Sequence, residues 1–378
     1  MIKIHTVEEN LLYTIIGIYA FSWIFQMFYY LFFMLRTANH KPTAPSEETK
    51  PLSVVICAKN EAINLEQFIP LVCTQDYPNY EVIVVNDSSS DDTEMALTRL
   101  KNKYANLYYT SIRASKQFYQ GKKLALTIGI KAANHEHLVF TDADCKPTSD
   151  QWLREISAQL SDKKQIIVGH GRFTKKRSLF NLFLRYETFW NTVQYMGFTL
   201  RGLPFMAVGR NMAYTKSLFL EKDVFKPFLN MASGDDDLFM RACANKHNTA
   251  IQLNYNSQTE SVPPRNLGEW FTRKSRHLTT APKYRFNIKF WLITEALSRQ
   301  IFWLLTLCSL FFPTFAPITV SLFIVRLVVL HIVLGKAAKK MGENKLYMAT
   351  LIFDLITPII VGCVWVTNIF SAKKKKWK

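Results

Sequence analysis

The chain has 378 residues, which leaves room for one sizeable globular domain together with membrane segments. A hydrophobic fraction of 49%, with 28 phenylalanines, is high for a purely soluble protein, and the apolar residues concentrate at the two ends. Much of the formal net charge of +18 lies beside these apolar segments and no nucleic-acid-binding module is recognisable, which argues against nucleic acid and for membrane lipids as partners.

The first predicted element is an uncharged apolar helix over residues 11–35, long enough to cross a bilayer. A secretory signal peptide would need a basic start and a shorter apolar core, whereas two glutamates precede this segment and basic residues follow it. We therefore predict a permanent anchor over residues 1–40, whose C-terminal end lies in the cytoplasm. Residues 41–50, with two prolines, are a polar linker.

Strand and helix patterns alternate in the next region, residues 51–289. Helices are predicted over residues 61–73, 93–104 and the stretch after Gly121, and apolar strands begin at Leu52, Tyr80 and His137. This alternation predicts a parallel α/β sheet, in which ligands bind beyond the carboxyl ends of the strands. The six scattered cysteines have neither CxxC nor metal-like spacing, which is typical of a reducing compartment.

Residues 290–378 are predicted to be a membrane region of two or three helices with a basic tail. Apolar runs cover residues 300–312, 318–334 and 346–370; the first extends back to about position 291 and forms a hairpin with the second. Arg326 and Asp354 lie within these runs, so they face protein or a polar cavity, or else snorkel or mark distortions.

The basic tail, from Lys373 to Lys378, creates a conflict in this topology. Three full crossings with the globular domain inside would place the tail outside, against the positive-inside tendency. A last segment that re-enters near Pro358, or that lies in the interface, would resolve the conflict.

Polar residues follow the predicted strands at their carboxyl ends. Asn60 and Glu61 follow the first strand and Asp87 ends the second, where a base or ribose could lie against them. Polar turns that cap the next helices are the alternative interpretation. Asp142 and Asp144 follow the third strand, and two hard oxygen ligands in this arrangement suit Mg²⁺ or Mn²⁺, although a solvated loop would also explain them.

Two further clusters carry charge. Three aspartates from Asp235 to Asp237 open a helical pattern, where one complements the helix dipole and another is placed to act as a general base. Arg273, Arg276 and His277 lie on nearby faces of a helix. Guanidinium groups there could stabilise a departing diphosphate, and a basic membrane-surface helix explains them equally well.

Taken in order, these elements resemble the family 2 glycosyltransferases, over about residues 51–285. The resemblance implies a Rossmann-like GT-A domain of the α/β class, flanked by transmembrane helices. It also implies that Asp142 and Asp144 form the DxD metal motif, with Asp144 the more direct ligand, and that Asn211 lies on the acceptor side. The residues expected around the nucleotide are Ala58, Asn60, Glu61, Asp87 and Lys122.

Two motifs depart from the family pattern. The Glu-Asp base motif becomes Gly234-Asp235, so Asp235 is the expected base and Asp236 its rival. The QxxRW motif of processive synthases keeps only its arginine, Arg276, because Arg273 replaces the glutamine and His277 the tryptophan. The loss of that tryptophan favours single addition over processive synthesis.

The resemblance implies an integral membrane hexosyl- or hexosaminyltransferase with a cytoplasmic catalytic domain. It would move a sugar with inversion from a nucleotide-diphosphate donor, UDP-linked by family tendency, to a lipid-linked or saccharide acceptor in cell-envelope glycan synthesis, using Mg²⁺ or Mn²⁺. One alternative is a processive polysaccharide synthase, which needs a channel through several spans. An alternative of another class is a non-catalytic membrane scaffold that binds nucleotide.

Overall fold

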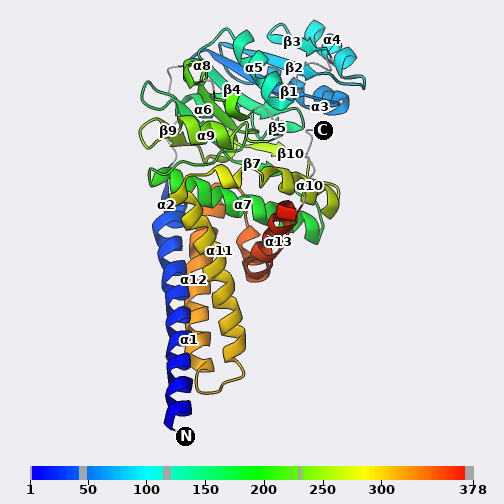
Figure 1. Cartoon of the computed structure of the whole chain (residues 1–378). Helices are drawn as coiled ribbons and strands as arrows, with labels where there is room; N and C mark the ends of the chain where they lie inside the picture. The colour runs from blue at the N-terminus through cyan, green and yellow to red at the C-terminus, as the bar shows by residue number, and fades with distance from the viewer. Residues whose placement is uncertain are drawn as a thin grey trace.

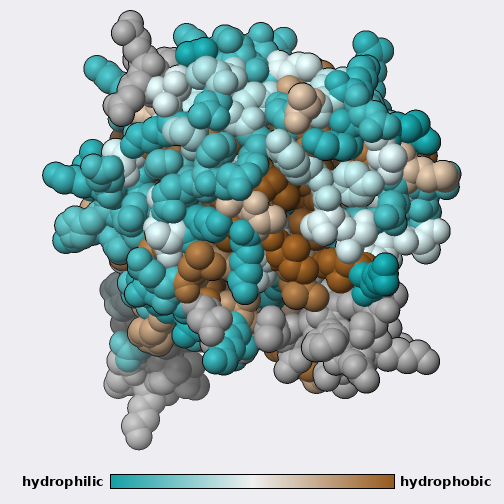
Figure 2. Space-filling model, turned by 90° about the horizontal axis from the view of Figure 1, so that it is seen from above, coloured by the Kyte–Doolittle hydropathy of each residue, from teal (hydrophilic) through white to brown (hydrophobic). Residues whose placement is uncertain are grey.

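The computed structural model describes residues 2–41, 49–113, 121–222, 224–228, 231 and 233–370; most of the predicted linker and the basic tail lie outside these residues. Figure 1 shows an α/β domain at one end of a bundle of long helices, with the N-terminus at the far end of the bundle. Seen from above, the domain surface is largely hydrophilic, and apolar side chains gather near the middle of that face (Figure 2).

The domain is built on a seven-stranded mixed sheet. Its first four strands run parallel, as predicted, and β8 runs antiparallel to both of its neighbours. Every residue of β1 is buried, because helices cover both faces of a parallel sheet. In spatial order the strands are β3 (Leu107–Ile112), β2 (Tyr80–Asp87), β1 (Leu52–Ala58), β4 (His137–Asp142), β8 (Met212–Thr215), β6 (Ile166–Val168) and β9 (Thr249–Ile251).

Alternate residues of β1 belong to two separate cores. Val54 and Ile56 pack with α3 (Ala62–Cys73), α4 (Thr93–Lys103) and α6 (Trp152–Ser157). Val55 and Cys57 face the larger core, to which α5 (Lys122–Ala132), α7 (Leu179–Leu200), α8 (Lys216–Lys222) and α9 (Asp237–Cys243) contribute. The predicted helices over residues 61–73 and 93–104 are thus confirmed as α3 and α4. A small sheet of β5 (Cys145–Pro147), β10 (Thr259–Ser261) and β7 (Gly171–Phe173) lies beside the main one.

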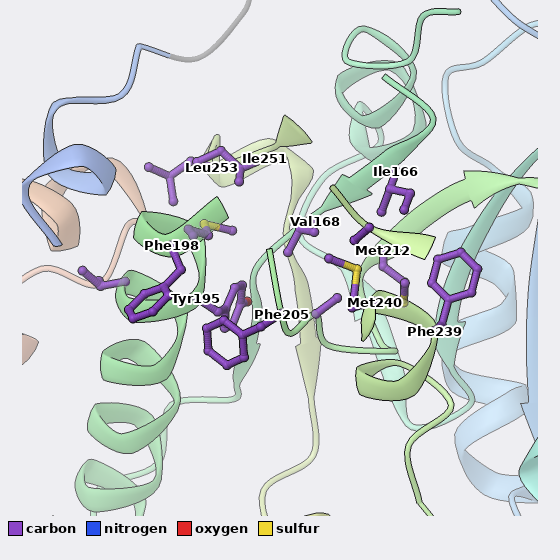
Figure 3. Close-up of a cluster of buried hydrophobic side chains, with 14 of the residues drawn as sticks. Ile166, Val168, Tyr195, Phe198, Phe205, Met212, Phe239, Met240, Ile251 and Leu253 are labelled. Carbon is purple, nitrogen blue, oxygen red and sulfur yellow. The ribbon is translucent and has the colours of Figure 1, made fainter. Parts of the chain in front are cut away.

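Helix α7 joins the sheet to the helical bundle. Figure 3 shows Tyr195 and Phe198 of α7 gathered with side chains of β6, β8, β9 and α9 in one buried cluster. On its other side α7 meets η1, a π-helical turn over Tyr30–Met34, where Phe33 stacks on Phe198 at 4.1 Å between ring centroids. A Cβ at Gly197 would lie 2.4 Å from the Phe33 carbonyl oxygen, so this approach requires glycine.

Three described helical segments are long and apolar enough to cross a membrane: Leu12–Asn39, Ala316–Lys340 and Leu346–Phe370. The first comprises most of α1 (Ile2–Tyr29), with η1 and α2 (Leu35–Asn39). The predicted hairpin is formed by α11 (Phe286–Ser309) and α12 (Ala316–Lys340), which lie beside α1 (Figure 1). Its first helix begins at Phe286, before the predicted boundary at 290.

A buried ionic cluster ties these helices together. Arg326 Nη1 of α12 donates to Asp354 Oδ2 of α13 (Thr350–Phe370) at 2.7 Å, and Arg326 Nη2 donates to Gln26 of α1 at 2.9 Å. Arg299 of α11 forms ion pairs with Asp354 at 3.5 Å and with Glu295 at 3.2 Å. The prediction that Arg326 and Asp354 face protein is therefore confirmed.

Helix α13 does not follow the other long helices but turns away from their axis (Figure 1). Phe353 near its start packs on Phe183 and Tyr186 of α7, with centroid distances of 5.6 and 5.4 Å. Near its end, Asn368 donates to the carbonyl of Ser275 on α10 (Leu267–His277) at 2.7 Å. Both ends of α13 therefore contact helices of the α/β domain, and a re-entrant or interfacial last segment stays a prediction.

Candidate active site

A cavity of about 1110 Å³ opens at the carboxyl ends of β1 and β4, where ligands bind in open α/β sheets. It continues along α7 and α10, and its far end lies between α11 and α13. The predicted site residues that line it are Glu61, Lys122, Asp142, Asp144, Asp235, Asp236, Arg273, Arg276 and His277.

Lys122 links two of the predicted acidic motifs. It occupies the first turn of α5, and its Nζ lies 2.8 Å from Asp142 Oδ1 and 2.8 Å from Asp235 Oδ2. Burial opposes the charge on Lys122, but the two carboxylates outweigh it and hold its pKa well above the usual value. Burial alone would raise the pKa of Asp142, but the charge of Lys122 has the larger effect and the net pKa is lowered, so the carboxyl stays ionised.

The end of β4 offers a set of cation ligands. Ligand atoms of Asp142, Asp144 and Cys145 lie within 4.8 Å of one another. Burial holds the pKa of the Cys145 thiol well above its usual value, so this sulfur stays protonated and is a poor ligand. Two carboxylates at this spacing fit a hard divalent ion such as Mg²⁺ or Mn²⁺.

The three consecutive aspartates have different surroundings. Burial opposes ionisation of Asp235, but Lys122 lowers its pKa to about 2. Asp236 caps α9: its Oδ1 accepts from the Asp237 backbone N–H at 2.8 Å and its Oδ2 from Gly209 at 3.0 Å, while burial and the charge of Asp235 raise its pKa to about 6.

Asp237 has different hydrogen-bond partners from the other two aspartates. Its Oδ2 accepts from Thr280 Oγ1 at 2.8 Å and from Tyr284 OH at 2.6 Å, which anchors α9 to the segment after α10. Burial and the charge of Asp236 raise the pKa of Asp237 to about 8, so this carboxyl is largely neutral at physiological pH.

Helix α10 brings its basic residues to the cavity. Asn266 caps its N-terminus by accepting from the Glu269 backbone N–H, and Glu269 accepts from the Arg265 backbone N–H, each at 2.9 Å. Arg276 is largely buried, and its Nε has no hydrogen-bond partner among the described residues. A buried guanidinium nitrogen without a partner suits an incoming anion.

The other two predicted residues of α10, Arg273 and His277, have different surroundings. Arg273 donates to Glu269 at 2.6 Å, and its Nη1 lies 3.9 Å from Asp144 Oδ2. His277 lines the cavity, where desolvation and the adjacent charge of Arg276 lower the pKa of its imidazole.

The predicted nucleotide residues form a second group at the sheet edge. Asp87 is fully buried at the end of β2, and its Oδ2 pairs with Lys59 Nζ at 3.6 Å. Neither oxygen of Asp87 accepts a hydrogen bond at standard distance from the described part of the chain, and burial raises its pKa. Asn60, at φ 55°, accepts from the Ser90 backbone at 2.8 Å. Asn60 and Asp87 adjoin the cavity wall at Lys59 and Glu61 but do not line it.

Two further predicted substrate residues, Asn211 and Ala58, do not line the cavity. Asn211 is buried; it accepts from the Trp152 indole at 3.1 Å and donates to the carbonyls of His170 and Ser257 at 2.8 and 2.9 Å. These three hydrogen bonds hold the Asn211 side chain within the fold, and its acceptor-side role stays a prediction. Ala58 is fully buried within β1 and does not line the cavity.

Several lining residues were not predicted. Lys59 follows the first strand directly, and its place beside Asn60 was a usable signal. Glu187 of α7 and Lys274 of α10 form an ion pair in the cavity lining, and their separation in the sequence gave no signal.

Comparison with known proteins identifies the domain. Residues 53–221 match the family described as Glycosyl transferase family 2. These residues are a family 2 glycosyltransferase domain. The predicted fold class is confirmed, since the mixed sheet is that of the GT-A glycosyltransferases.

Curated relatives support the family 2 assignment. Glycosyltransferase AglE of Haloferax volcanii is 31% identical over 192 residues, which cover 49% of this chain and 58% of that protein. The poly-beta-1,6-N-acetyl-D-glucosamine synthase of Staphylococcus epidermidis is 27% identical over 160 residues, 42% of this chain and 38% of the synthase. The chain thus spans about half the length of these relatives.

A solved structure shares the fold over almost the whole chain. The mannosyltransferase PcManGT from Pyrobaculum calidifontis, in complex with GDP-Man and Mn²⁺, superposes with a TM-score of 0.60 at 18% identity. The superposition covers 95% of this chain and 99% of that one. The likeness therefore includes the helices that follow the GT-A domain.

Proposed function

We propose that this protein is a membrane-bound inverting glycosyltransferase that moves one sugar from a nucleoside diphosphate to a lipid-linked or membrane-proximal acceptor. The observation that carries the proposal is the bridge of Lys122 between Asp142 and Asp235, with Arg276 in the same cavity. A donor diphosphate, its cation and an acceptor hydroxyl need such a grouping of carboxylates and cations.

The donor half of the cavity is the edge formed by β1, β2 and β4. Asp87 would accept from the base, because neither of its buried oxygens accepts a hydrogen bond from the described residues. Asp142 and Asp144 would hold a divalent cation, which would neutralise charge on the diphosphate. The Mn²⁺ in the PcManGT complex supports divalent metal use in this fold. Arg276 would donate to the departing diphosphate as its negative charge grows.

We infer that Asp235 is the general base. Asp236 accepts two backbone N–H groups and Asp237 holds Thr280 and Tyr284, so both serve the fold. The partner of Asp235 is Lys122, a cavity side chain that a diphosphate would attract. A shift of Lys122 toward the phosphates would raise the pKa of Asp235 and make it a stronger base when the donor is bound.

A donor panel tests the proposal. Full-length protein in detergent micelles or vesicles is incubated with UDP- and GDP-linked hexoses and N-acetylhexosamines, and release of nucleoside diphosphate is measured with Mg²⁺, Mn²⁺ or a chelator. We expect metal-dependent release with at least one donor and its loss in Asp144→Ala. Nucleotide binding without turnover across the whole panel would instead support the scaffold alternative, and product length on a gel separates single addition from processive synthesis.

A further inference from the structure

The cavity does not end at the carboxylates but continues into a groove between α11 and α13. Most of the side chains that line this groove are apolar, and Lys289, Glu295, Arg299 and Thr357 are the polar or charged ones from the same two helices. The apolar walls are formed by Leu292, Ile293, Ala296 and Leu297 from α11 and by Pro358, Val361, Gly362 and Trp365 from α13.

The groove is open to the surroundings of the helices. Ile293, Leu297 and Trp365 are 56%, 58% and 48% exposed, although they are large and apolar. A Cβ built at Gly362 would meet no atom within 4 Å, so the groove floor is open at this position. Helix α13 belongs to one of the three described segments that are long and apolar enough to cross a membrane, and contiguous exposed apolar side chains on such a helix suit contact with lipid.

Two pairs of oppositely charged side chains line the cavity. Lys274 is paired with Glu187, and Arg299 is paired with Glu295 at 3.2 Å; all four are cavity-lining side chains. Lys289, half-buried at the start of α11, is the remaining cation of this end within the described lining. A lipid phosphate would need several cations that are not already neutralised by carboxylates.

We propose that the acceptor is an uncharged, hydroxyl-bearing lipid that enters sideways from the membrane through the groove between α11 and α13. This inference rests on the proposed transferase function and specifies its acceptor. The apolar body lies in the groove and the hydroxyl reaches Asp235. The acceptor O–H bond breaks and its proton passes to Asp235; the oxygen bonds to the anomeric carbon while the bond from that carbon to the diphosphate breaks, and nucleoside diphosphate leaves.

Filling the groove tests the proposal without disturbing the donor site. In Gly362→Leu the new side chain enters the open groove, and Gly17→Leu is the matched control, because Gly17 of α1 also has open space around its Cβ position. We expect Gly362→Leu to lower transfer to a long-chain alcohol or to diacylglycerol in vesicles by roughly tenfold or more. Hydrolysis of the same donor by water should stay unchanged, and Gly17→Leu should change neither rate.

An acceptor panel decides the chemical class. Wild-type protein is given the neutral lipids, a polyprenyl phosphate of similar chain length, or a water-soluble oligosaccharide. Preference for the neutral lipids supports the proposal. Preference for the phosphate, with a strong loss in Lys289→Ala, would overturn it, as would transfer to the soluble sugar that Gly362→Leu leaves intact. Absence of both hydrolysis and transfer with every donor would defeat the proposed function itself, so the two failures are distinguishable.

Discussion

Replacing Asp235 by asparagine, with Asp236→Asn as its matched control, tests which of two adjacent carboxylates takes the proton of the acceptor. Loss of a general base lowers turnover by about 10²–10⁴-fold, or ~2.7–5.5 kcal/mol in the barrier. Asp236 instead accepts two backbone N–H groups, at 3.0 and 2.8 Å. Asparagine caps helices as well as aspartate and keeps one of these two acceptors, so that variant should lose ~1–2 kcal/mol of stability and less than about tenfold in turnover.

Release of nucleoside diphosphate in the presence of acceptor measures turnover, and nucleotide titration calorimetry shows whether the donor site is intact. We expect Asp235→Asn to bind nucleotide while turnover collapses. A larger loss of turnover in Asp236→Asn than in Asp235→Asn, at equal nucleotide affinity, would refute the reasoning from hydrogen-bond partners. It would also transfer the base role to the carboxyl whose pKa of about 6 is better matched to neutral pH.

Three further outcomes follow from the described contacts. Asp237 has a pKa of about 8 in the folded protein and the usual low value in the unfolded chain, so the native state keeps a proton that the unfolded chain releases. The free energy of unfolding should therefore fall as the pH rises from about 4 to about 8, by up to ~6 kcal/mol. The Asp237→Asn variant should lack this decline, and thermal unfolding at pH 5 and pH 9 would contradict the assignment if both proteins lost equal stability. Gly197→Ala should destabilise the protein by ~1–3 kcal/mol, because the new Cβ meets the Phe33 carbonyl. Gly17→Ala is the control, since its Cβ would lie in open space. Equal unfolding midpoints for the two variants would count against the close packing of α7 on η1. Removal of divalent metal by a chelator should abolish turnover and weaken nucleotide binding, and Mn²⁺ or Mg²⁺ should restore both. A cation at Asp142 would be contradicted if the nucleotide affinity of the wild type did not depend on metal while Asp142→Asn changed that affinity.

The sequence by itself determined the sheet and the acidic ends of its strands. Buried apolar runs that end in Asp87 and Asp142 predict parallel strands, and the carboxyl ends of neighbouring parallel strands meet at one edge whatever the side-chain packing. The helix over residues 93–104 followed in the same way from local pattern. These features depend on residues close together in the chain, so short motifs encode them.

Tertiary structure alone decided which side chains meet across the chain. Lys122 joins Asp142 to Asp235, whereas Asn211 turns inward to the fold, and neither outcome is encoded in a motif. The path of α13 was open in the sequence, because length and apolarity are the same for a crossing and an interfacial helix. Packing of Phe353 on α7 and the pairing of Asp354 with α11 and α12 set that path, and with it the groove between α11 and α13 that continues from the cavity.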